Sequence, residues 1–240
     1  MKKPHLSVVI PAYNEALRIQ TTLESVDAYL KQQLYSYEVI IVNDGSKDTT
    51  VSVVEAFIKT TTNFKLIDNQ TNHGKGWVVR QGMLEAQGKF RLFMDADNST
   101  TIDHVEKFFE EFENKYDIVI SSRRIVGAQM PIRQSIIREL LGSIFRKIVQ
   151  TIVPLGVVDS QNGFKLFTAE AAEHIFARQV IVSWAFDVEI LALARLFGYK
   201  IKEEPVCYID DARSHMTTKG MIKMLREVIQ VKINLFAARY

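Results

Sequence analysis

Short apolar runs alternate with amphipathic segments over the first 122 residues of the chain. The runs are rich in β-branched residues and are typical of buried strands; they cover residues 6–10, 38–42, 64–68, 90–94 and 117–122. The segments between them carry apolar residues at helical spacing, which predicts helices over residues 12–33, 51–58, 77–87 and 102–115. This alternation indicates an α/β fold of right-handed βαβ units, with a mainly parallel twisted sheet flanked by helices.

The pattern changes after Arg123. The following elements are predicted there: helices over residues 132–153, 169–176, 186–197 and 219–240, a strand over 164–167, and a strand over 200–208 that Pro205 interrupts. The chain has no internal repeat and no glycine- or serine-rich linker. We therefore expect one domain over residues 1–210, with halves 1–122 and 123–210, and a C-terminal amphipathic helical appendage over 211–240.

Polar or glycine-bearing motifs follow four of the predicted strands. They cover residues 13–15, 44–46, 73–76 and 95–99. Open α/β sheets bind ligands at the carboxyl edge of their strands. Ordinary turns and helix caps are the alternative, and they account for Ser46 better than for Glu15 or the paired aspartates.

The fourth strand ends in Asp95-Ala96-Asp97. An extended chain places Asp95 and Asp97 on the same side, with Ala96 opposite. Two hard oxygen ligands at a strand end suit Mg²⁺ or Mn²⁺ that carries the phosphates of a substrate. The alternative is a polar turn in which Asp97 or Ser99 caps the next helix.

Composition limits the class of protein. The 240 residues are 47% hydrophobic and 24% charged, as in a soluble globular protein, and the net charge of +2 gives no reason to expect a nucleic-acid partner. A single cysteine, Cys207, excludes an internal disulfide and a cysteine-cluster metal site and fits a reducing compartment. No apolar run approaches the roughly 20 residues of a membrane-spanning helix, and no signal peptide precedes the first strand.

Several common catalytic motifs are missing from the sequence. It has neither a P-loop nor a dinucleotide-binding glycine motif after the first strand, and it has no nucleophile elbow. The five histidines are scattered without metal-ligand spacing.

Three motifs of the first half resemble, in order and spacing, the nucleotide-sugar half of family 2 glycosyltransferases. They are residues 8–15, 42–46 and 95–97. The resemblance continues through residues 122–123, 159–167 and 184–189, where the chain is similar to the dolichyl-phosphate β-glucosyltransferase branch. It covers nearly the whole chain, and it implies a GT-A fold and an inverting transfer of a sugar from a nucleoside diphosphate sugar to a polyprenyl phosphate.

The resemblance also implies roles for individual residues of the first half. Asp95 and Asp97 would hold the donor diphosphate and its Mg²⁺ or Mn²⁺, and Lys75 would lie near the nucleotide pocket. The residues implied to hold the base and ribose are Pro11, Tyr13, Glu15 and Asp44. A metal ion would neutralise the leaving diphosphate and lower the barrier to its departure.

The acceptor half would bind a second anion. A phosphate monoester is ionised near neutral pH and can attack the anomeric carbon without a strong general base. The resemblance places Arg123, Arg133 and Arg138 as its cationic clamp; a solvated helix face is the alternative for Arg133 and Arg138. Asp187 lies where many members of the family carry a base-like carboxylate, and here it could instead orient a sugar hydroxyl or a lysine.

The chain departs from the family pattern at three positions. Asn43 replaces the first aspartate of a common pair, and Asn162 replaces a cysteine of the eukaryotic motif. Ser99 stands where the mannose synthases have glutamine, which weakens a mannose donor and leaves the third protein ligand of the metal open.

We therefore expect a metal-dependent inverting transferase that moves glucose from UDP-glucose to a polyprenyl or dolichyl phosphate. The alternatives are another donor such as GDP-mannose or a UDP-N-acetylhexosamine, a glycan or protein acceptor, and a non-catalytic nucleotide-sugar-binding subunit. The basic amphipathic helices predict a peripheral position at the cytoplasmic face of a membrane. Packing of these helices on the domain or on a second copy, as a homo-oligomer, is the alternative.

Overall fold

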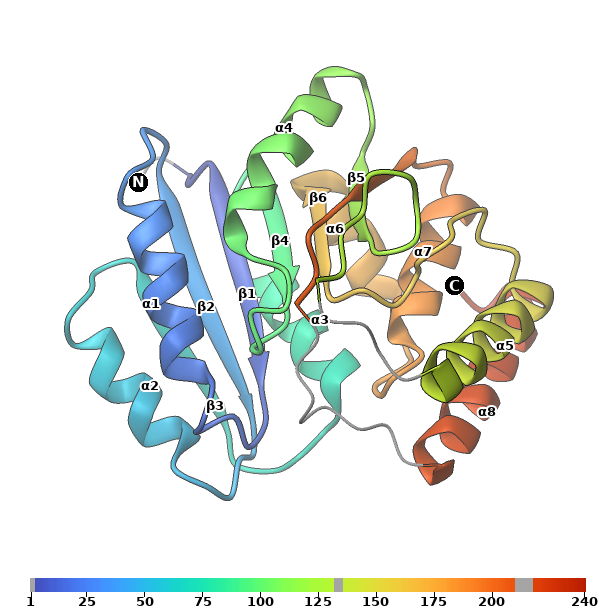
Figure 1. Ribbon diagram of the computed structural model, residues 1–240, viewed down its shortest axis with the longest axis horizontal. Helices are drawn as coiled ribbons and strands as arrows, with labels where there is room; N and C mark the ends of the chain where they lie inside the picture. Colours follow the sequence, from blue (N-terminus) through green and yellow to red (C-terminus); the bar gives the residue numbers. More distant parts are fainter. Residues whose placement is uncertain (1–2, 132–135, 210–217) are drawn as a thin grey trace.

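A seven-stranded sheet with helices on both faces forms the molecule (Figure 1), as seen in a computed structural model that describes residues 3–131, 136–209 and 218–240. The strand order is β3-β2-β1-β4-β6-β5-β7, and β6 runs antiparallel to β4 and β5 while the other pairs are parallel. The strands are β1 (Leu6–Ala12), β2 (Tyr37–Asp44), β3 (Phe64–Asn69), β4 (Phe90–Met94), β5 (Ile118–Ser122), β6 (Phe164–Thr168) and β7 (Ile201–Pro205). The expected mainly parallel α/β sheet is confirmed.

The helices cover the two faces of the sheet because successive strand residues point to opposite faces. In β1, Val8 and Ile10 pack under α1, α2 and α4, whereas Val9 belongs to a second apolar cluster with α3 and α5 to α8. The helices are α1 (Ile19–Leu30), α2 (Thr50–Ile58), α3 (Lys75–Glu85), the 3-10 turn η1 (Ile102–His104), α4 (Val105–Glu113), α5 (Ile136–Ile152), α6 (Ala169–Arg178), α7 (Phe186–Leu196) and α8 (Thr218–Phe236).

The first predicted helix begins later than the sequence indicated. We expected it to open at residue 12, but α1 begins at Ile19 because Asn14 has a left-handed backbone with φ of 55°. The preceding turn is bonded to the loop after β2: the Asn14 N–H donates to Ser46 Oγ at 2.9 Å, and the Glu15 N–H donates to Thr50 Oγ1 at 2.8 Å. The backbone donors of this segment are therefore used between loops rather than within a helix.

The C-terminal helix packs on the rest of the protein. Met224, Val228 and Val231 of α8 are buried in the same apolar cluster as Val9 of β1, and α8 contacts both α5 and α7. Figure 1 shows α5 and α8 side by side at the end of the molecule away from β3. The other predicted elements occur within the described residues with ends shifted by a few positions; residues 132–135 of the predicted fifth helix lie outside them.

Candidate active site

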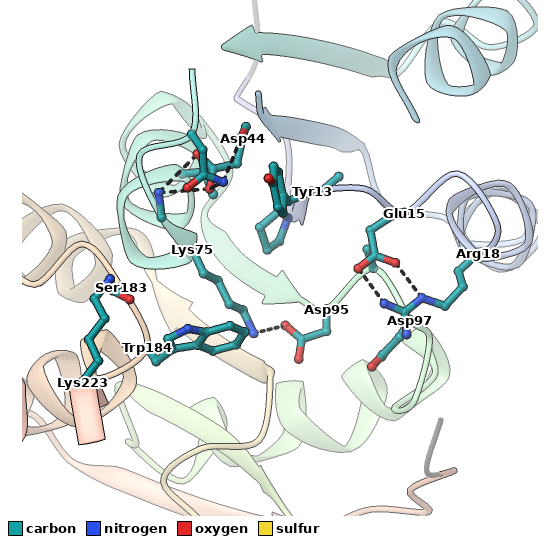
Figure 2. A pocket seen from close by; sticks show the side chains of 16 residues that line it. Tyr13, Glu15, Arg18, Asp44, Lys75, Asp95, Asp97, Ser183, Trp184 and Lys223 are labelled. Atoms are coloured by element: carbon teal, nitrogen blue, oxygen red, sulfur yellow. Dashed lines mark hydrogen bonds and ion pairs between the residues drawn. The ribbon is translucent and has the colours of Figure 1, made fainter. Parts of the chain in front are cut away.

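A cavity of about 370 Å³ opens at the carboxyl edge of the sheet, where β1, β2 and β4 end and α3 begins (Figure 2). The four polar motifs that follow the first four strands all contribute to it, as expected for an open α/β sheet. The residues that line the cavity are Pro11, Ala12, Tyr13, Glu15, Arg18, Asp44, Asn72, Gly74, Lys75, Val78, Asp95, Ala96, Asp97, Ser183, Trp184 and Lys223.

Asp44 organises the loop between β3 and α3. Its carboxylate accepts hydrogen bonds from the His73 N–H at 2.6 Å, the Gly74 N–H at 3.0 Å and the Asn72 side-chain amide at 2.9 Å. Gly74 has φ of 102°, and a Cβ there would lie 2.5 Å from the Val182 carbonyl oxygen, so only glycine fits. Asp44 thus lines the cavity while its oxygens also hold the cavity wall.

Glu15 and Arg18 form a bidentate ion pair at the rim of the cavity. Both guanidinium–carboxylate contacts measure 2.6 Å. Burial raises the pKa of the Glu15 carboxyl above its ordinary value, and the hydrogen bonds and charge of Arg18 offset part of that rise. This pairing fixes the carboxylate in a geometry from which it can accept from a ligand hydroxyl or N–H.

Lys75 and Asp95 pair in the centre of the cavity. Their Nζ and Oδ1 atoms lie 2.6 Å apart, and both side chains remain partly exposed (Figure 2). Burial alone would lower the pKa of Lys75, but the charges of Asp95 and Asp187 raise it above its ordinary value. A Cβ on Gly163 would lie 2.0 Å from Asp95 Oδ2, so this glycine, which directly precedes β6, makes room for the carboxylate.

Asp97 gives the cavity an excess of negative charge. Its Oδ1 accepts from the Ser99 N–H at 2.9 Å, while burial and the neighbouring charge of Asp95 raise its pKa. The lining contains four carboxylates and three cationic side chains. A diphosphate would add further negative charge, so the residues fit a divalent cation between the aspartates and the diphosphate.

The protein supplies only part of a metal coordination shell. Within the described ranges, no group of three or more histidine, cysteine, aspartate or glutamate side chains could hold a metal ion. Mg²⁺ typically binds through one or two carboxylates and completes its shell with water and substrate phosphates. Asp95 and Asp97 match that donor set.

A second lysine–aspartate pair lies outside the lining of the cavity. Lys165 of β6 is fully buried, donates to the Asn162 carbonyl at 2.6 Å and contacts the Asp187 carboxylate in the first turn of α7. Burial lowers the pKa of Lys165 and raises that of Asp187, and each charge opposes the shift of the other. Of the partners considered for Asp187, the structure shows a lysine.

Arg123, at the end of β5, belongs to a separate cationic group. Its guanidinium forms a bidentate pair with buried Asp159 at 2.7 and 2.8 Å and stacks on the Tyr208 ring at 4.8 Å. Burial raises the pKa of Tyr208, and the charges of Asp97 and Asp95 raise it further while Arg123 opposes them. Tyr208 therefore lies within electrostatic range of both Arg123 and the aspartates of the cavity.

Two more arginines accompany Arg123. Arg124 pairs with Glu139 at 3.0 Å, and burial together with the positive charges of Arg124 and Arg123 lowers the pKa of Arg146 on α5. Arg133 lies outside the described residues. Arg138 belongs to α5, but its side chain is also outside what the structure describes.

Sequence reasoning missed several residues that shape these sites. Lys165 had one available signal, because a lysine between Phe164 and Leu166 in an apolar run is rarely buried without a partner. Trp184 belongs to the motif of residues 184–189 but was given no role, and Lys223 carried no pattern that placed it at a cavity, since it reaches the cavity through the packing of α8.

Comparison with known proteins agrees with this arrangement. Residues 7–176 match the sequence model of the family described as Glycosyl transferase family 2. The dolichyl-phosphate beta-glucosyltransferase of Dictyostelium discoideum is 36% identical over 241 residues, which cover 95% of this chain and 74% of that protein. The corresponding enzyme of Saccharomyces cerevisiae is 34% identical over 247 residues, with the same coverage of 95% and 74%.

Solved structures show the same fold. Glucosyl-3-phosphoglycerate synthase from Mycobacterium tuberculosis, in complex with Mn²⁺, UDP and glucosyl-3-phosphoglycerate, has a TM-score of 0.71 at 17% identity and covers 96% of this chain and 79% of its own. The same enzyme with Mg²⁺ and UDP also gives 0.71, at 18% identity. These neighbours confirm the expected GT-A fold. The family match and the sequence relatives show that the protein is an enzyme, and that the chain belongs to glycosyl transferase family 2.

Proposed function

We propose that this glycosyltransferase transfers glucose from UDP-glucose to a polyprenyl or dolichyl phosphate with inversion at the anomeric carbon. The names of its sequence relatives support the sugar and the acceptor, and the UDP complexes of its structural neighbour support the nucleotide. One observation of this chain carries the proposal: the cavity joins Lys75, Asp95 and Asp97 at the edge where such sheets bind ligands.

The donor would occupy the cavity lengthwise. Tyr13, with Pro11 behind it, offers an aromatic surface for the base, and Glu15 and Asp44 offer carboxylate oxygens to base N–H groups or ribose hydroxyls. Lys75 would contact the diphosphate by exchanging part of its pairing with Asp95.

Asp95 and Asp97 would hold Mg²⁺ or Mn²⁺, which neutralises the charge that develops on the departing diphosphate. Lys75 adds a fixed positive charge beside the same bond. Asp187 keeps Lys165 paired directly behind the aspartates and so supports the electrostatics of the site rather than acting as a strong base. An ionised acceptor phosphate does not need such a base.

The acceptor phosphate would bind at Arg123, with Arg133 and Arg138 as the further cations that the family resemblance implies. A guanidinium has five donors, and the pair with Asp159 leaves some of them for a second anion. Tyr208, which stacks on Arg123, also senses the charges of Asp97 and Asp95, and donor and acceptor would meet between the two groups.

The protein would work peripherally at the cytoplasmic face of a membrane. Exposed apolar side chains project from α5 and α8 among basic residues; they are Ile144, Ile148, Ile222, Ile229, Ile233 and Phe236. Such a face can lie among the headgroups of an anionic leaflet, where the acceptor phosphate is presented. Nowhere in the described segments is a helix both long and apolar enough to span a bilayer.

A transfer assay across a panel of nucleotide sugars, with and without a short polyprenyl phosphate, tests this function. We expect product only with UDP-glucose and the lipid phosphate. Turnover with GDP-mannose or a UDP-N-acetylhexosamine instead would contradict the donor, and turnover with a glycan or peptide would contradict the acceptor. Sedimentation with anionic vesicles tests the membrane position, and protein that stays in solution at low salt would favour a homo-oligomer.

A further inference from the structure

The loop before α7 forms the wall of the cavity beside the start of α3. Ser183 and Trp184 line the cavity, and the Trp184 side chain is 47% exposed. The Val182 carbonyl accepts from the Trp77 N–H at 3.1 Å and lies against Gly74, so the loop also contacts the start of α3. An exposed tryptophan held at a cavity rim is a surface on which a ligand can stack.

Glu227 of α8 holds the end of this loop. Its carboxylate accepts a hydrogen bond from the Ala185 N–H at 3.1 Å. Ala185 is the N-cap residue of α7, and no side chain caps this helix from its own sequence. The N-terminus of a helix carries partial positive charge and unpaired N–H groups, which a carboxylate stabilises.

The same helix reaches the cavity one turn earlier. Lys223 lines the cavity, and its Nζ lies 4.0 Å from Glu227 Oε1. Glu227 is the single acidic residue in the sequence of α8. The only carboxylate of this helix is therefore placed where it orders the residue next to Trp184.

The order of the side chains along the cavity indicates which part of a nucleotide sugar would reach Trp184 and Lys223. Figure 2 shows Asp44 and Tyr13 on one side of the Lys75–Asp95 pair, and Trp184 with Lys223 on the other. A nucleotide bound at Tyr13 with its diphosphate at Lys75 would direct its sugar toward Trp184. The apolar face of a hexose stacks well on an aromatic ring, and its hydroxyls suit a lysine ammonium.

We propose that Trp184 and Lys223 form the hexose-binding end of the donor cavity and that Glu227 is the positioning residue that holds them in place. The inference rests on the proposed function for the identity of the donor. In this arrangement α8 takes part in donor recognition. Loss of Glu227 should weaken the affinity for UDP-glucose, which carries the sugar, and leave the affinity for UDP unchanged.

Equilibrium binding of UDP and of UDP-glucose, each with the same concentration of Mg²⁺, tests this separation in Glu227→Ala, Glu227→Gln and wild type. Glu227→Ala should weaken UDP-glucose binding by about tenfold, because the Ala185 N–H loses its acceptor and the neighbouring Trp184 is no longer held at the cavity, and it should change UDP binding by less than about twofold. Glu227→Gln keeps an acceptor oxygen, so its affinity for UDP-glucose should lie between those of wild type and Glu227→Ala. Gln230→Ala, an exposed polar change on the same helix, is the matched control and should behave as wild type.

Equal weakening of UDP and UDP-glucose would overturn the inference, and so would unchanged binding of both in a folded Glu227→Ala protein. If Glu227→Ala does not fold, Glu227→Gln decides by the same criterion. The proposed function fails separately: wild type that binds UDP-glucose without transferring it to a polyprenyl phosphate contradicts the acceptor and leaves this inference standing.

Discussion

Two lysine–aspartate pairs lie near each other in this protein and differ in access to solvent. In the Lys75–Asp95 pair the side chains are 24% and 33% exposed, whereas in the Lys165–Asp187 pair they are 0% and 7% exposed. The exposed pair can exchange its partners with a ligand, because water and ligand atoms compete for it. The buried pair cannot, since separating it would leave an unpaired charge in the interior. We therefore propose a role in ligand binding for the first pair and a structural role for the second.

Breaking the buried pair should have the largest effect on stability. Lys165→Met leaves Asp187 buried without its partner, and we expect the free energy of unfolding to fall by about 3–5 kcal/mol. The double variant Lys165→Met with Asp187→Leu removes both charges and should recover much of this loss. Urea unfolding followed by circular dichroism measures both. A single variant as stable as wild type would show that the pair does not support the fold.

Removing the second cavity aspartate should affect activity and spare stability. Asp97→Ala should lower metal-dependent transfer by about 10²–10³-fold or more, because one carboxylate remains to hold the cation. The residue lies at a loop edge, so the melting temperature should change little. Initial rates over a range of Mg²⁺ and Mn²⁺ concentrations measure the effect. Near-normal turnover of the variant, or wild-type turnover in excess chelator, would refute the metal site.

A variant of Arg123 tests the proposed binding site of the acceptor phosphate, which lies apart from both lysine–aspartate pairs. Arg123→Ala should raise the acceptor KM or lower transfer at least about tenfold, on the order of 1.5–3 kcal/mol, while donor binding stays near wild type. The same holds for Arg138 if it contributes to the clamp. Lys202→Ala on β7, whose ion pairs are with Glu111 and Glu204, is a control cation and should retain transfer. Equal losses of donor and acceptor affinity would instead assign Arg123 to the diphosphate or to the fold.

The pH dependence of stability should show the smallest effect. Burial alone would raise the pKa of Asp159, but the hydrogen bonds and charge of Arg123 lower it by more. The pKa of Asp159 in the folded protein is therefore below its ordinary value. A lowered pKa stabilises the fold above the ordinary pKa of about 3.9, and this stabilisation is lost as the pH falls through the folded value.

The difference in unfolding free energy between wild type and Arg123→Ala should therefore shrink as the pH is lowered from about 5 to about 3. Urea unfolding at several pH values measures it. A difference that is constant with pH, or that grows in acid, would show that Arg123 does not stabilise the charged form of Asp159.

The cavity residues at the strand ends could be predicted from the sequence, and much of the rest of the candidate site could not. Motifs such as Asp44 and Asp95 follow directly after parallel strands, so the topology alone brings them to one edge. The pairs Arg123–Asp159, Lys165–Asp187 and Ala185–Glu227 join segments 22 to 42 residues apart. Their partners depend on how helices pack, which periodicity does not encode.

Local backbone geometry explains why α1 begins later than the sequence predicted. The apolar spacing after β1 continues into residues 13–18, and it predicts a helix there, but Asn14 adopts a left-handed conformation and its neighbours bond to the loop after β2. Asn and Asp tolerate this conformation better than other residues, so Asn14 was the available signal. The displaced helix start is what frees Tyr13 and Glu15 to line the cavity.

NMR analysis of the product that wild type forms from UDP-glucose and a short polyprenyl phosphate, with Mg²⁺ and with excess chelator, reports both its anomeric configuration and its dependence on the metal. We expect a glucosyl phosphate lipid of β configuration, opposite to that of the α-linked donor, formed only with the metal. An α-linked product, or equal product in excess chelator, would contradict metal-dependent inverting transfer at Asp95 and Asp97.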